Sequence, residues 1–180
     1  MRQLLSSCVR MMKASISVAS MRDARALADL RTRVAREMTR EFGVGHWSPC
    51  PCKAEVVRQL RASKVLIASR DSEIIGTVRL AQALPGLIDS ESFTKVDTAL
   101  YVLGLAVSPD VRRQGVGRDL MDAVKESARS WPADALWLDA YDHVAGAGAF
   151  YQACGFRAVG PSAKGAIPLI FYEWLPQPRN

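Results

Sequence analysis

The sequence predicts one α+β domain in which a mixed, mostly antiparallel central sheet is flanked by helices. The order of the expected elements predicts this class, because a helix pair and a strand hairpin precede the alternating strands and helices of the C-terminal half. The segment 99–107 is almost entirely apolar, as expected for a central strand that is buried on both faces. The chain is also long enough for a substantial core, with 180 residues of which 49% are hydrophobic and 23% charged.

The N-terminal half is expected to contain a strand, two helices and a hairpin. The first helix begins near Ser20, because Ser20 and Asp23 have the spacing of a capping box and apolar residues follow at helical spacing. Asp71 and Ser72 supply the turn between two strands rich in β-branched residues. The expected elements are a strand over 16–18, a helix from Ser20 with Leu27, Leu30, Val34 and Met38 on its apolar face, a loop over 42–53, a helix over 55–62, and strands over 64–70 and 73–84.

In the C-terminal half, strands and helices alternate after a polar segment. Gly104 lies within the apolar strand, where it marks either a β-bulge or close packing. Gly146 and Gly148 each weaken their helix by about 1 kcal/mol relative to alanine, which indicates either a close approach of other atoms or a loosely wound helix. The expected elements are a polar segment over 85–98, a strand over 99–107, a helix with Val116, Leu120, Val124 and Ala128 on its buried face, a strand over 136–141, a helix over 146–154, and strands over 156–159 and 169–174.

The most informative segment runs from the apolar strand through a basic, glycine-containing turn into a helix. Arg112, Gly115 and Gly117 are spaced so that the backbone can approach a ligand, and the first turn of the following helix presents free N–H groups. Such a turn at a helix N-terminus binds anions. The alternative is an ordinary strand-to-helix connection with solvated arginines. The residues assigned to a diphosphate-binding role are Arg112, Arg113, Gln114, Gly115, Val116, Gly117 and Arg118.

Arg112, Gly115 and Gly117 match the signature of the GNAT superfamily of acyl-CoA-dependent N-acetyltransferases, in which Arg or Gln is followed by two residues, Gly, one residue, and Gly or Ala. A second resemblance lies at Phe150–Phe156, which matches the Tyr-x-x-x-Gly-Phe ending of the family's next helix. The chain resembles this family from about Leu66 to Phe171. The resemblance implies the acyl-CoA N-acyltransferase (GNAT) fold, in which the central strand and its neighbour splay apart around the pantetheine arm. It also implies acetyl-CoA as the cofactor.

The same resemblance implies roles for residues on and after the central strand. Main-chain N–H groups of Leu105, Ala106 and Val107 are expected to bind the pantetheine and the acetyl oxygen. Tyr151 matches the family's general acid, since a phenol with an ordinary pKa of about 10 stays protonated at neutral pH; the alternative role for Tyr151 is a core aromatic. Ala145 stands where many members have an asparagine that contacts the cofactor, so this chain departs from the family at that contact.

The acceptor side carries less sequence signal than the cofactor side. Its candidates come from the loop over 42–53, which often lines the acceptor cleft in the family, and from the strand over 136–141 and the residues just after it. A surface position for the histidines and a packing role for the aromatic residues are the alternatives. The candidates for the substrate site are His46, Trp47, Asp139 and Tyr141, and the candidates for the general base are His46, Asp139, Asp142 and His143.

Composition argues against several other classes of protein. The four cysteines show neither paired C-x-x-C motifs nor the spacing of a secreted disulfide framework, so reduced thiols and a cytoplasmic location are expected. His46, Cys50 and Cys52 lack a fourth ligand, so we expect no metal site. No window is long and apolar enough to span a membrane. We expect a flexible leader over 1–15, with Met1, Met11 or Met12 as the native start, and a single domain over 16–176.

These features predict a cytoplasmic N-acetyltransferase, a monomer or a homodimer, that transfers the acetyl group of acetyl-CoA directly to the primary amine of a small molecule. Two alternatives stay open: a catalytically silent acyl-CoA-binding sensor and a basic nucleic-acid-binding module. The net charge of +6 fits nucleic acid, but the basic residues are scattered and lack the interleaved aromatic residues that stack on single strands. We therefore expect neither a nucleic-acid nor a membrane partner.

Overall fold

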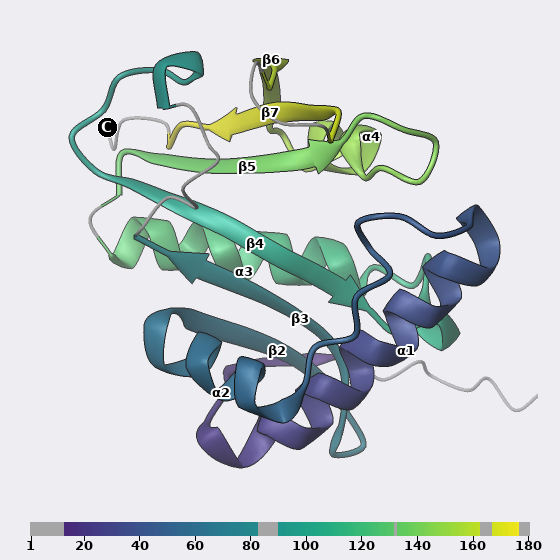
Figure 1. Ribbon diagram of the computed structural model, residues 1–180. Helices are drawn as coiled ribbons and strands as arrows, with labels where there is room; N and C mark the ends of the chain where they lie inside the picture. Colours follow the sequence, from purple (N-terminus) through teal and green to yellow (C-terminus); the bar gives the residue numbers. More distant parts are fainter. Residues whose placement is uncertain (1–12, 83–89, 132, 163–166, 177–180) are drawn as a thin grey trace, which may run out of the picture.

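A computed structural model of the chain describes residues 13–82, 90–131, 133–162 and 167–176. These ranges contain one seven-stranded sheet with the strand order β1-β2-β3-β4-β5-β7-β6 (Figure 1). Among its neighbouring strands only β4 and β5 are parallel, which confirms the predicted mixed, mostly antiparallel α+β class. The strands are β1 (Ser15–Val18), β2 (Lys64–Arg70), β3 (Glu73–Ala81), β4 (Ala99–Val107), β5 (Ala135–Tyr141), β6 (Arg157–Pro161) and β7 (Leu169–Trp174).

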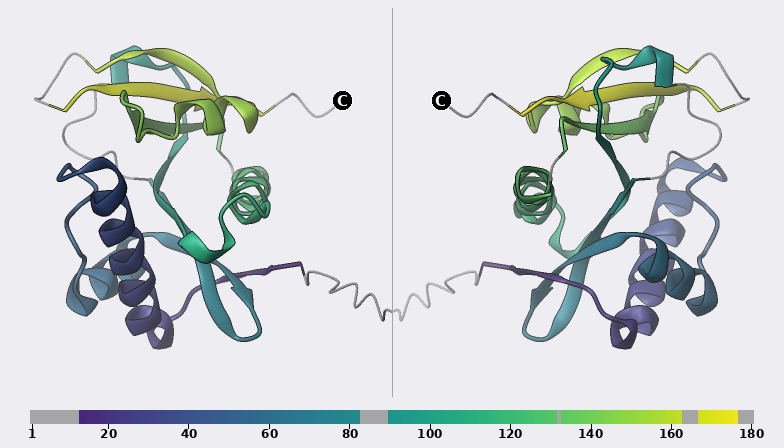
Figure 2. Two further views of the ribbon diagram at one scale, coloured as in Figure 1. Left: turned by 90° about the vertical axis from the view of Figure 1, so that its right-hand side faces the viewer. Right: turned by 90° about the vertical axis from the view of Figure 1, so that its left-hand side faces the viewer.

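Helices cover both faces of the sheet. α1 and α2 lie on one face and α3 lies on the other, so that the sheet forms the middle layer (Figure 1, Figure 2). Short 3-10 turns precede α1, β4 and α3. The helices are α1 (Ala24–Phe42), α2 (Lys53–Ala62), α3 (Val116–Ser130) and α4 (Gly148–Ala153), and the 3-10 turns are η1 (Met21–Asp23), η2 (Ser90–Ser92) and η3 (Pro109–Val111).

Each helical layer buries its own apolar cluster against the sheet. Under α1, Leu27 and Leu30 are each 1% exposed, whereas Val34 packs at the edge of the cluster and is only partly buried. Burying a leucine of this kind stabilises the fold by about 1.5–3 kcal/mol. On the other face, the apolar side of α3 predicted from its four-residue spacing is buried as expected. The buried residues of α3 are Val116, Leu120, Met121, Val124, Ser127 and Ala128.

The start of α1 confirms the predicted capping box. The backbone N–H of Ser20 donates to Asp23 Oδ2 at 2.7 Å, and the N–H of Arg22 donates to Ser20 Oγ at 3.3 Å. The capped turn is a 3-10 turn, so the α-helix itself begins only at Ala24. The cap satisfies N–H groups that a helix start leaves without partners, and it fixes the entry of α1 onto the sheet.

β2 and β3 form the predicted hairpin. Its two turn residues, Asp71 and Ser72, have φ angles of 49° and 65°. Two successive left-handed residues are the requirement of a type I′ turn, whose twist matches that of the flanking strands. β3 ends at Ala81. The predicted extension of this strand to Leu84 lies outside the described residues, as does much of the polar segment that follows.

β4 has the predicted bounds, but its burial is interrupted at Gly104. Residues 100–102 are at most 4% exposed, whereas Gly104 is exposed. At this point β4 carries one extra residue relative to β3, and the register shifts between Thr77 and Arg79. Gly104 has a φ of 59°, in the left-handed region that favours glycine. The β-bulge is therefore confirmed, and the expectation of burial on both faces is wrong at Gly104, whereas Ala106 is buried and Leu105 and Val107 are partly buried.

The helix predicted over 146–154 is shorter than expected. α4 begins at Gly148 because the residues before it are held against the end of β5. A Cβ at Gly146 would overlap the carbonyl oxygen of Tyr141, and a Cβ at Gly148 would overlap the hydroxyl of Tyr172. Close approach of other atoms, and not loose winding, therefore accounts for both glycines.

Glu173 on β7 is a fully buried carboxylate that holds the segment before β4 against the sheet. It accepts hydrogen bonds from the backbone N–H of Thr94 at 2.8 Å and from the Thr94 hydroxyl at 2.7 Å, and it forms an ion pair with Arg157. Burial raises the pKa of Glu173, but these hydrogen bonds and the charge of Arg157 outweigh burial and hold the pKa below its ordinary value. The ionised form therefore stabilises this half of the sheet.

We expect Glu173→Ala to lower the free energy of unfolding by about 2 kcal/mol, because the donors of Thr94 lose their acceptor in a part-buried position. Since the pKa is depressed in the folded state, this contribution is present above the ordinary pKa of glutamate and is lost as pH falls through the folded value. Urea denaturation of the wild type and the variant from about pH 3 to pH 7 measures both effects. A difference that stays constant over that range would contradict the expectation.

Candidate active site

The edge of β4 that faces β5 is open in the second half of the strand. The two strands pair in parallel only where Ala99–Tyr101 lie beside Ala135–Trp137, and beyond that point they diverge (Figure 1). In the described part of the chain, the main chain of 105–107 therefore has no partner strand on the β5 side. Exposed main-chain groups at a strand edge bind extended ligands through hydrogen bonds. Leu105, Ala106 and Val107, the residues that the sequence assigns to the cofactor, all lie on this edge.

The turn after β4 has the backbone geometry that an anion site requires. Gly115 is the N-cap of α3 with a φ of 87°, and no side chain caps the helix there. A Cβ on Gly115 would meet no atom within 4 Å among the described residues, so the turn borders open space. The first N–H groups of a helix have no partner within the helix and carry partial positive charge. The turn therefore fits a diphosphate held by main-chain N–H groups.

Gly117 allows close packing of the start of α3. A Cβ on Gly117 would lie 3.2 Å from Cζ of Phe150 and 3.7 Å from Cγ2 of Val107. Contacts this tight require the neighbouring side chain to move. The second glycine of the motif thus lets the start of α3 pack against α4 and the end of β4.

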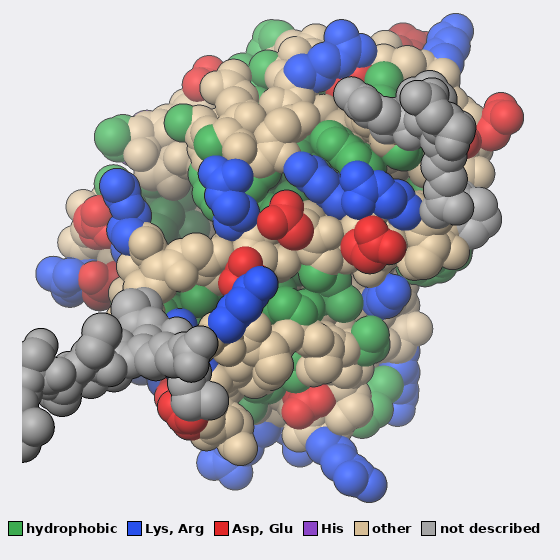
Figure 3. Space-filling view, turned by 180° about the vertical axis from the view of Figure 1, so that it is seen from behind, with side chains coloured by type: hydrophobic (Ala, Val, Ile, Leu, Met, Phe, Trp, Pro, Cys, Tyr) green, Lys and Arg blue, Asp and Glu red, His purple; other side chains and the backbone are tan. Residues whose placement is uncertain are grey.

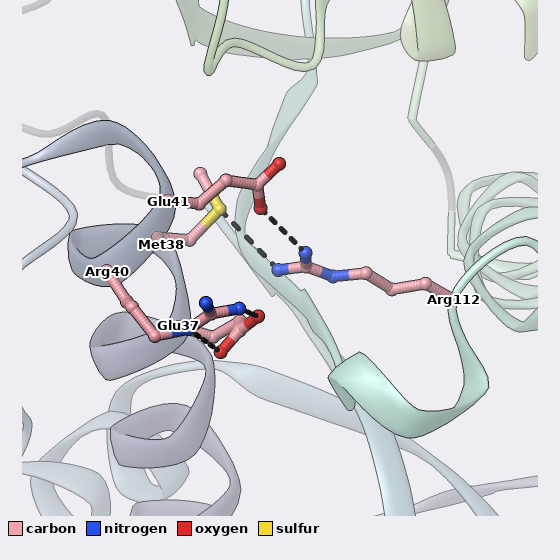
Figure 4. A network of polar contacts seen from close by, with 5 residues as sticks. All are labelled: Glu37, Met38, Arg40, Glu41 and Arg112. Carbon is pink, nitrogen blue, oxygen red and sulfur yellow. Dashed lines mark hydrogen bonds and ion pairs between the residues drawn. The ribbon is translucent and has the colours of Figure 1, made fainter.

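The arginines of the turn do not share one role. The guanidinium of Arg112 points away from α3 toward α1, where it forms an ion pair with Glu41 at 3.3 Å and contacts Sδ of Met38 at 3.6 Å (Figure 4). Arg113 and Arg118 are exposed. Gln114 accepts a hydrogen bond from Arg70 at 3.0 Å. The backbone of the turn, more than the side chain of Arg112, is therefore available to an anion.

Tyr151 lies on α4 within an aromatic cluster. It is 8% exposed, and its ring centroid lies 6.1 Å from those of Phe156 and Tyr172 and 5.4 Å from that of Phe150. Its hydroxyl has no hydrogen-bond partner among the described residues. Burial raises the pKa of Tyr151, and the negative charge of Asp139 raises it further. Tyr151 therefore stays protonated at neutral pH and combines the core position with the chemistry of a proton donor.

The acceptor-side candidates come together from separate parts of the chain. The loop between α1 and α2 places the rings of His46 and Trp47 over Tyr141, with centroid distances of 4.5 Å and 5.2 Å. His143 is a further member of the cluster, 5.2 Å from Tyr141. Asp139, two residues before Tyr141 on β5, accepts a hydrogen bond from the hydroxyl of Tyr101 at 2.6 Å. His46 is exposed, but partial burial of its ring lowers its pKa, and this effect exceeds the opposing effect of the Asp139 charge.

A cavity of about 370 Å³ lies between this loop, α1, α2 and the second half of β4. His46 and Trp47 line it, whereas Asp139, Tyr141 and His143 do not. Gly104, Leu105 and Ala106 also line it, so the cavity reaches the strand whose open edge faces β5. A space of this size can hold a small molecule.

Sequence reasoning missed several residues that line this cavity or adjoin it. Arg31, Met38 and Glu55 line the cavity, and Arg79 lies in a small recess next to it. Arg31 did carry a signal, because it falls four residues after Leu27 within the apolar face of α1. Glu55 and Arg79 carry no such signal, since a glutamate in a first helical turn and an arginine in a strand are common.

Cys154 packs in the core next to the site. It is 4% exposed and burial raises the pKa of its thiol, as expected for a small packing residue.

Over the described ranges no group of three or more His, Cys, Asp or Glu residues is placed to hold a metal ion, and no helix is long and apolar enough to cross a membrane. Figure 3 shows the face opposite to that of Figure 1, where Lys and Arg side chains are interspersed with Asp and Glu.

Several solved structures with the same fold are acetyltransferases by name. A ribosomal-protein-alanine N-acetyltransferase from Brucella melitensis has 18% identity and a TM-score of 0.69 over 90% of this chain and 99% of its own. Aminoglycoside 6'-acetyltransferase type Ii has 21% identity and a TM-score of 0.68 over 92% and 99%. yncA from Salmonella typhimurium, solved with its cofactor acetyl-CoA, has 14% identity and a TM-score of 0.67 over 94% and 97%. These similarities establish the fold.

Sequence similarity goes further than the fold. No curated protein matches the chain significantly. Residues 31–156, however, match the sequence profile of the acetyltransferase (GNAT) family, and this range contains the open edge of β4, the glycine turn, Tyr151 and the acceptor-side cavity. The chain is therefore a member of the acetyltransferase (GNAT) family.

Proposed function

We propose that this enzyme transfers the acetyl group of acetyl-CoA directly to the primary amine of a small-molecule acceptor. One observation carries the proposal: the second half of β4 lines the acceptor-side cavity and then leads into the glycine turn. A single strand thus joins a place for the cofactor to a place for the amine. Direct transfer between two bound molecules requires such a shared border, because the reacting atoms must approach within about 3–3.5 Å.

The cofactor half of the site consists mainly of backbone. N–H groups of Gln114, Gly115, Val116, Gly117 and Arg118 would hold the diphosphate, with Arg113 and Arg118 adding charge around it. The main chain of Leu105, Ala106 and Val107 would bind the pantetheine and the acetyl oxygen. Donors that are fixed in place before reaction stabilise a developing oxyanion better than mobile ones do.

Acetyl-CoA supplies an acetyl thioester, whose C–S bond breaks as the C–N bond to the acceptor forms. Tyr151 would donate its phenolic proton to the leaving sulfur, and its raised pKa keeps that proton in place until then. His46 would accept the proton that the amine loses, because its lowered pKa keeps the imidazole neutral at neutral pH. Trp47, which lines the cavity, would enclose the acceptor, and Tyr141 would hold the rings of His46 and Trp47 in position. Asp139 would hold Tyr101 through its hydrogen bond and act on His46 through its charge.

We place the enzyme in the cytoplasm. Cys50 and Cys52 are exposed free thiols, separated by one residue, that form no disulfide within the described residues. Exposed thiols of this kind persist in a reducing compartment.

Replacing Gly115 tests the backbone role of the turn. We expect Gly115→Val to abolish coenzyme A binding, because a β-branched residue cannot adopt the left-handed φ of the N-cap without strain. Arg113→Ala should only weaken binding severalfold, because it leaves the backbone unchanged. Isothermal titration of coenzyme A measures both affinities, and circular dichroism confirms that the variants are folded. Equal, modest losses in the two variants would contradict the expectation.

Replacing Tyr151 by Phe tests the proton donor. We expect turnover to fall by about 10²-fold or more, because protonation of the leaving sulfur is lost. Affinity for acetyl-CoA should hardly change, and the hydroxyl leaves no partner behind. Tyr172→Phe is the matched control, since Tyr172 packs in the same cluster. Steady-state kinetics by thiol release measures the effect, and wild-type turnover in Tyr151→Phe would refute the assignment.

The pH dependence of kcat/KM tests the assignment of the general base. A base acts in its neutral form, so kcat/KM should fall as pH drops through the pKa of His46, which lies below its ordinary value of about 6.5. We expect His46→Gln to reduce kcat/KM and to remove this acidic limb. His143→Gln should keep the limb, because His143 does not line the cavity. The reverse pattern in pH–rate profiles of the two variants would assign the base to His143 instead.

A further inference from the structure

We propose that the acceptor carries a carboxylate, which Arg31 and Arg79 bind beside the β4 bulge. The substrate class is then an amino acid or a similarly short amino carboxylate. This proposal rests on the function proposed above and names its acceptor.

Two arginines converge on the exposed main chain of the bulge. Nε of Arg79 lies 3.7 Å and Nη2 of Arg31 lies 3.8 Å from the point where a Cβ on Gly104 would stand. No other non-adjacent heavy atom among the described residues comes within 4 Å of that point. Gly104 and Arg31 border both the acceptor-side cavity and the small recess that contains Arg79. The space over the bulge is thus flanked by two cations.

The charges around the two arginines do not balance. Arg31 donates to Oε1 of Gln59, and Gln59 in turn donates to Oε1 of Glu55 at 3.0 Å. Nε of Arg79 is buried without a hydrogen-bond partner. Glu55 is the one carboxylate that acts on both guanidiniums in the described part of the chain. Two cations facing one anion leave one positive charge over, and a single carboxylate would neutralise it.

The electrostatics of the arginines agree with this count. Burial lowers the pKa of Arg31, and Glu55 opposes that effect. Burial also lowers the pKa of Arg79, and the nearby charge of Arg31 lowers it further. An arginine side chain stays ionised in proteins even where burial lowers its pKa, so the cluster remains cationic. A buried ionised donor without an acceptor is costly, and an incoming carboxylate removes that cost.

Geometry limits the acceptor to a short molecule. A guanidinium binds a carboxylate through two parallel hydrogen bonds, which fixes the anion beside Gly104. The main chain at 105–107, where the acetyl group would lie, follows immediately, and a strand rises by about 3.3 Å per residue. The amine and the carboxylate must therefore be separated by only a few bonds, as they are in an amino acid. Further cationic groups on the acceptor would be repelled by the same arginines.

A purely structural role for Arg79 is the competing explanation. The recess around it, about 10 Å³, is close to the size needed for one water molecule, which could satisfy the unpartnered Nε. In that case Arg79 would stabilise the packing of α1 on β3 and would not distinguish acids from amides. The experiment therefore compares acceptors that differ only in the carboxylate.

The assay measures thiol release from acetyl-CoA with each common amino acid, its carboxamide and its decarboxylated amine. For the wild type we expect kcat/KM to be at least about tenfold higher for the preferred free acid than for its amide. Arg79→Gln and Arg31→Gln should reduce this ratio toward one, by raising KM for the free acid alone. Arg79→Lys keeps the charge and should retain part of the preference. Arg33→Gln is the matched control, because Arg33 lies on the same helix but pairs with Glu73 at the surface.

The outcomes separate this proposal from the one it rests on. Equal rates for acids and amides in the wild type would overturn the carboxylate site and leave amine acetylation standing. If no amine is acetylated, the proposed function is refuted. The carboxylate site is then tested by measuring whether free acids and their amides raise the melting temperature of the coenzyme A complex. Stabilisation by a free acid alone, lost in Arg79→Gln but kept in Arg33→Gln, supports the site. No difference between acid and amide in this measurement overturns it.

Discussion

The loss of pairing between β4 and β5 beyond Tyr101 is the constraint on which the rest of the site depends. The two strands begin in parallel, but Gly104 inserts an extra left-handed residue into β4, and a bulge bends the strand that carries it. Separate apolar clusters hold the diverging halves: one under α3, one under α1 and α2, and one around Phe93, Trp137 and Phe171. The unpaired main chain is therefore exposed on a rigid frame, which suits donors that must be in place before a ligand arrives.

The same bulge serves both sides of the reaction. Toward β5 it opens the edge on which Leu105, Ala106 and Val107 lie, and toward α1 it brings bare main chain to the wall of the acceptor-side cavity. Arg112 adds a second link, because it leaves the glycine turn and reaches Met38, which lines that cavity, and Glu41 beside it (Figure 4). A part-exposed ion pair of this kind contributes at most about 1 kcal/mol. Its main consequence is positional, since it ties the turn to the helix that forms the cavity wall.

The sequence predicts those features that local chemistry determines. The Ser20 cap, the Asp71-Ser72 turn, the buried face of α3 and the bounds of β4 all follow from short-range spacing. The start of α4 does not, because it depends on contact between Gly146 and Tyr141. The cavity does not either: Arg31, Glu55 and Arg79 lie on three separate elements that meet only when α1 and α2 pack on the sheet. His46, Trp47 and Tyr141 could be named as candidates, but their stacking is a tertiary contact that spacing cannot reveal.

A cationic cluster beside an amine-binding cavity has a consequence for the chemistry as well as for recognition. A free ammonium near Arg31 and Arg79 would be destabilised relative to the neutral amine, because like charges disfavour the charged form. If a carboxylate binds first, it cancels one positive charge of the cluster. The repulsion between the arginines and the ammonium of the acceptor then weakens. The proton of a correctly bound acceptor must then be removed mainly by a side chain, and His46 is the neutral imidazole that lines the same cavity. Binding of the acceptor carboxylate by Arg31 and Arg79 thus also determines how far the reaction needs a general base such as His46.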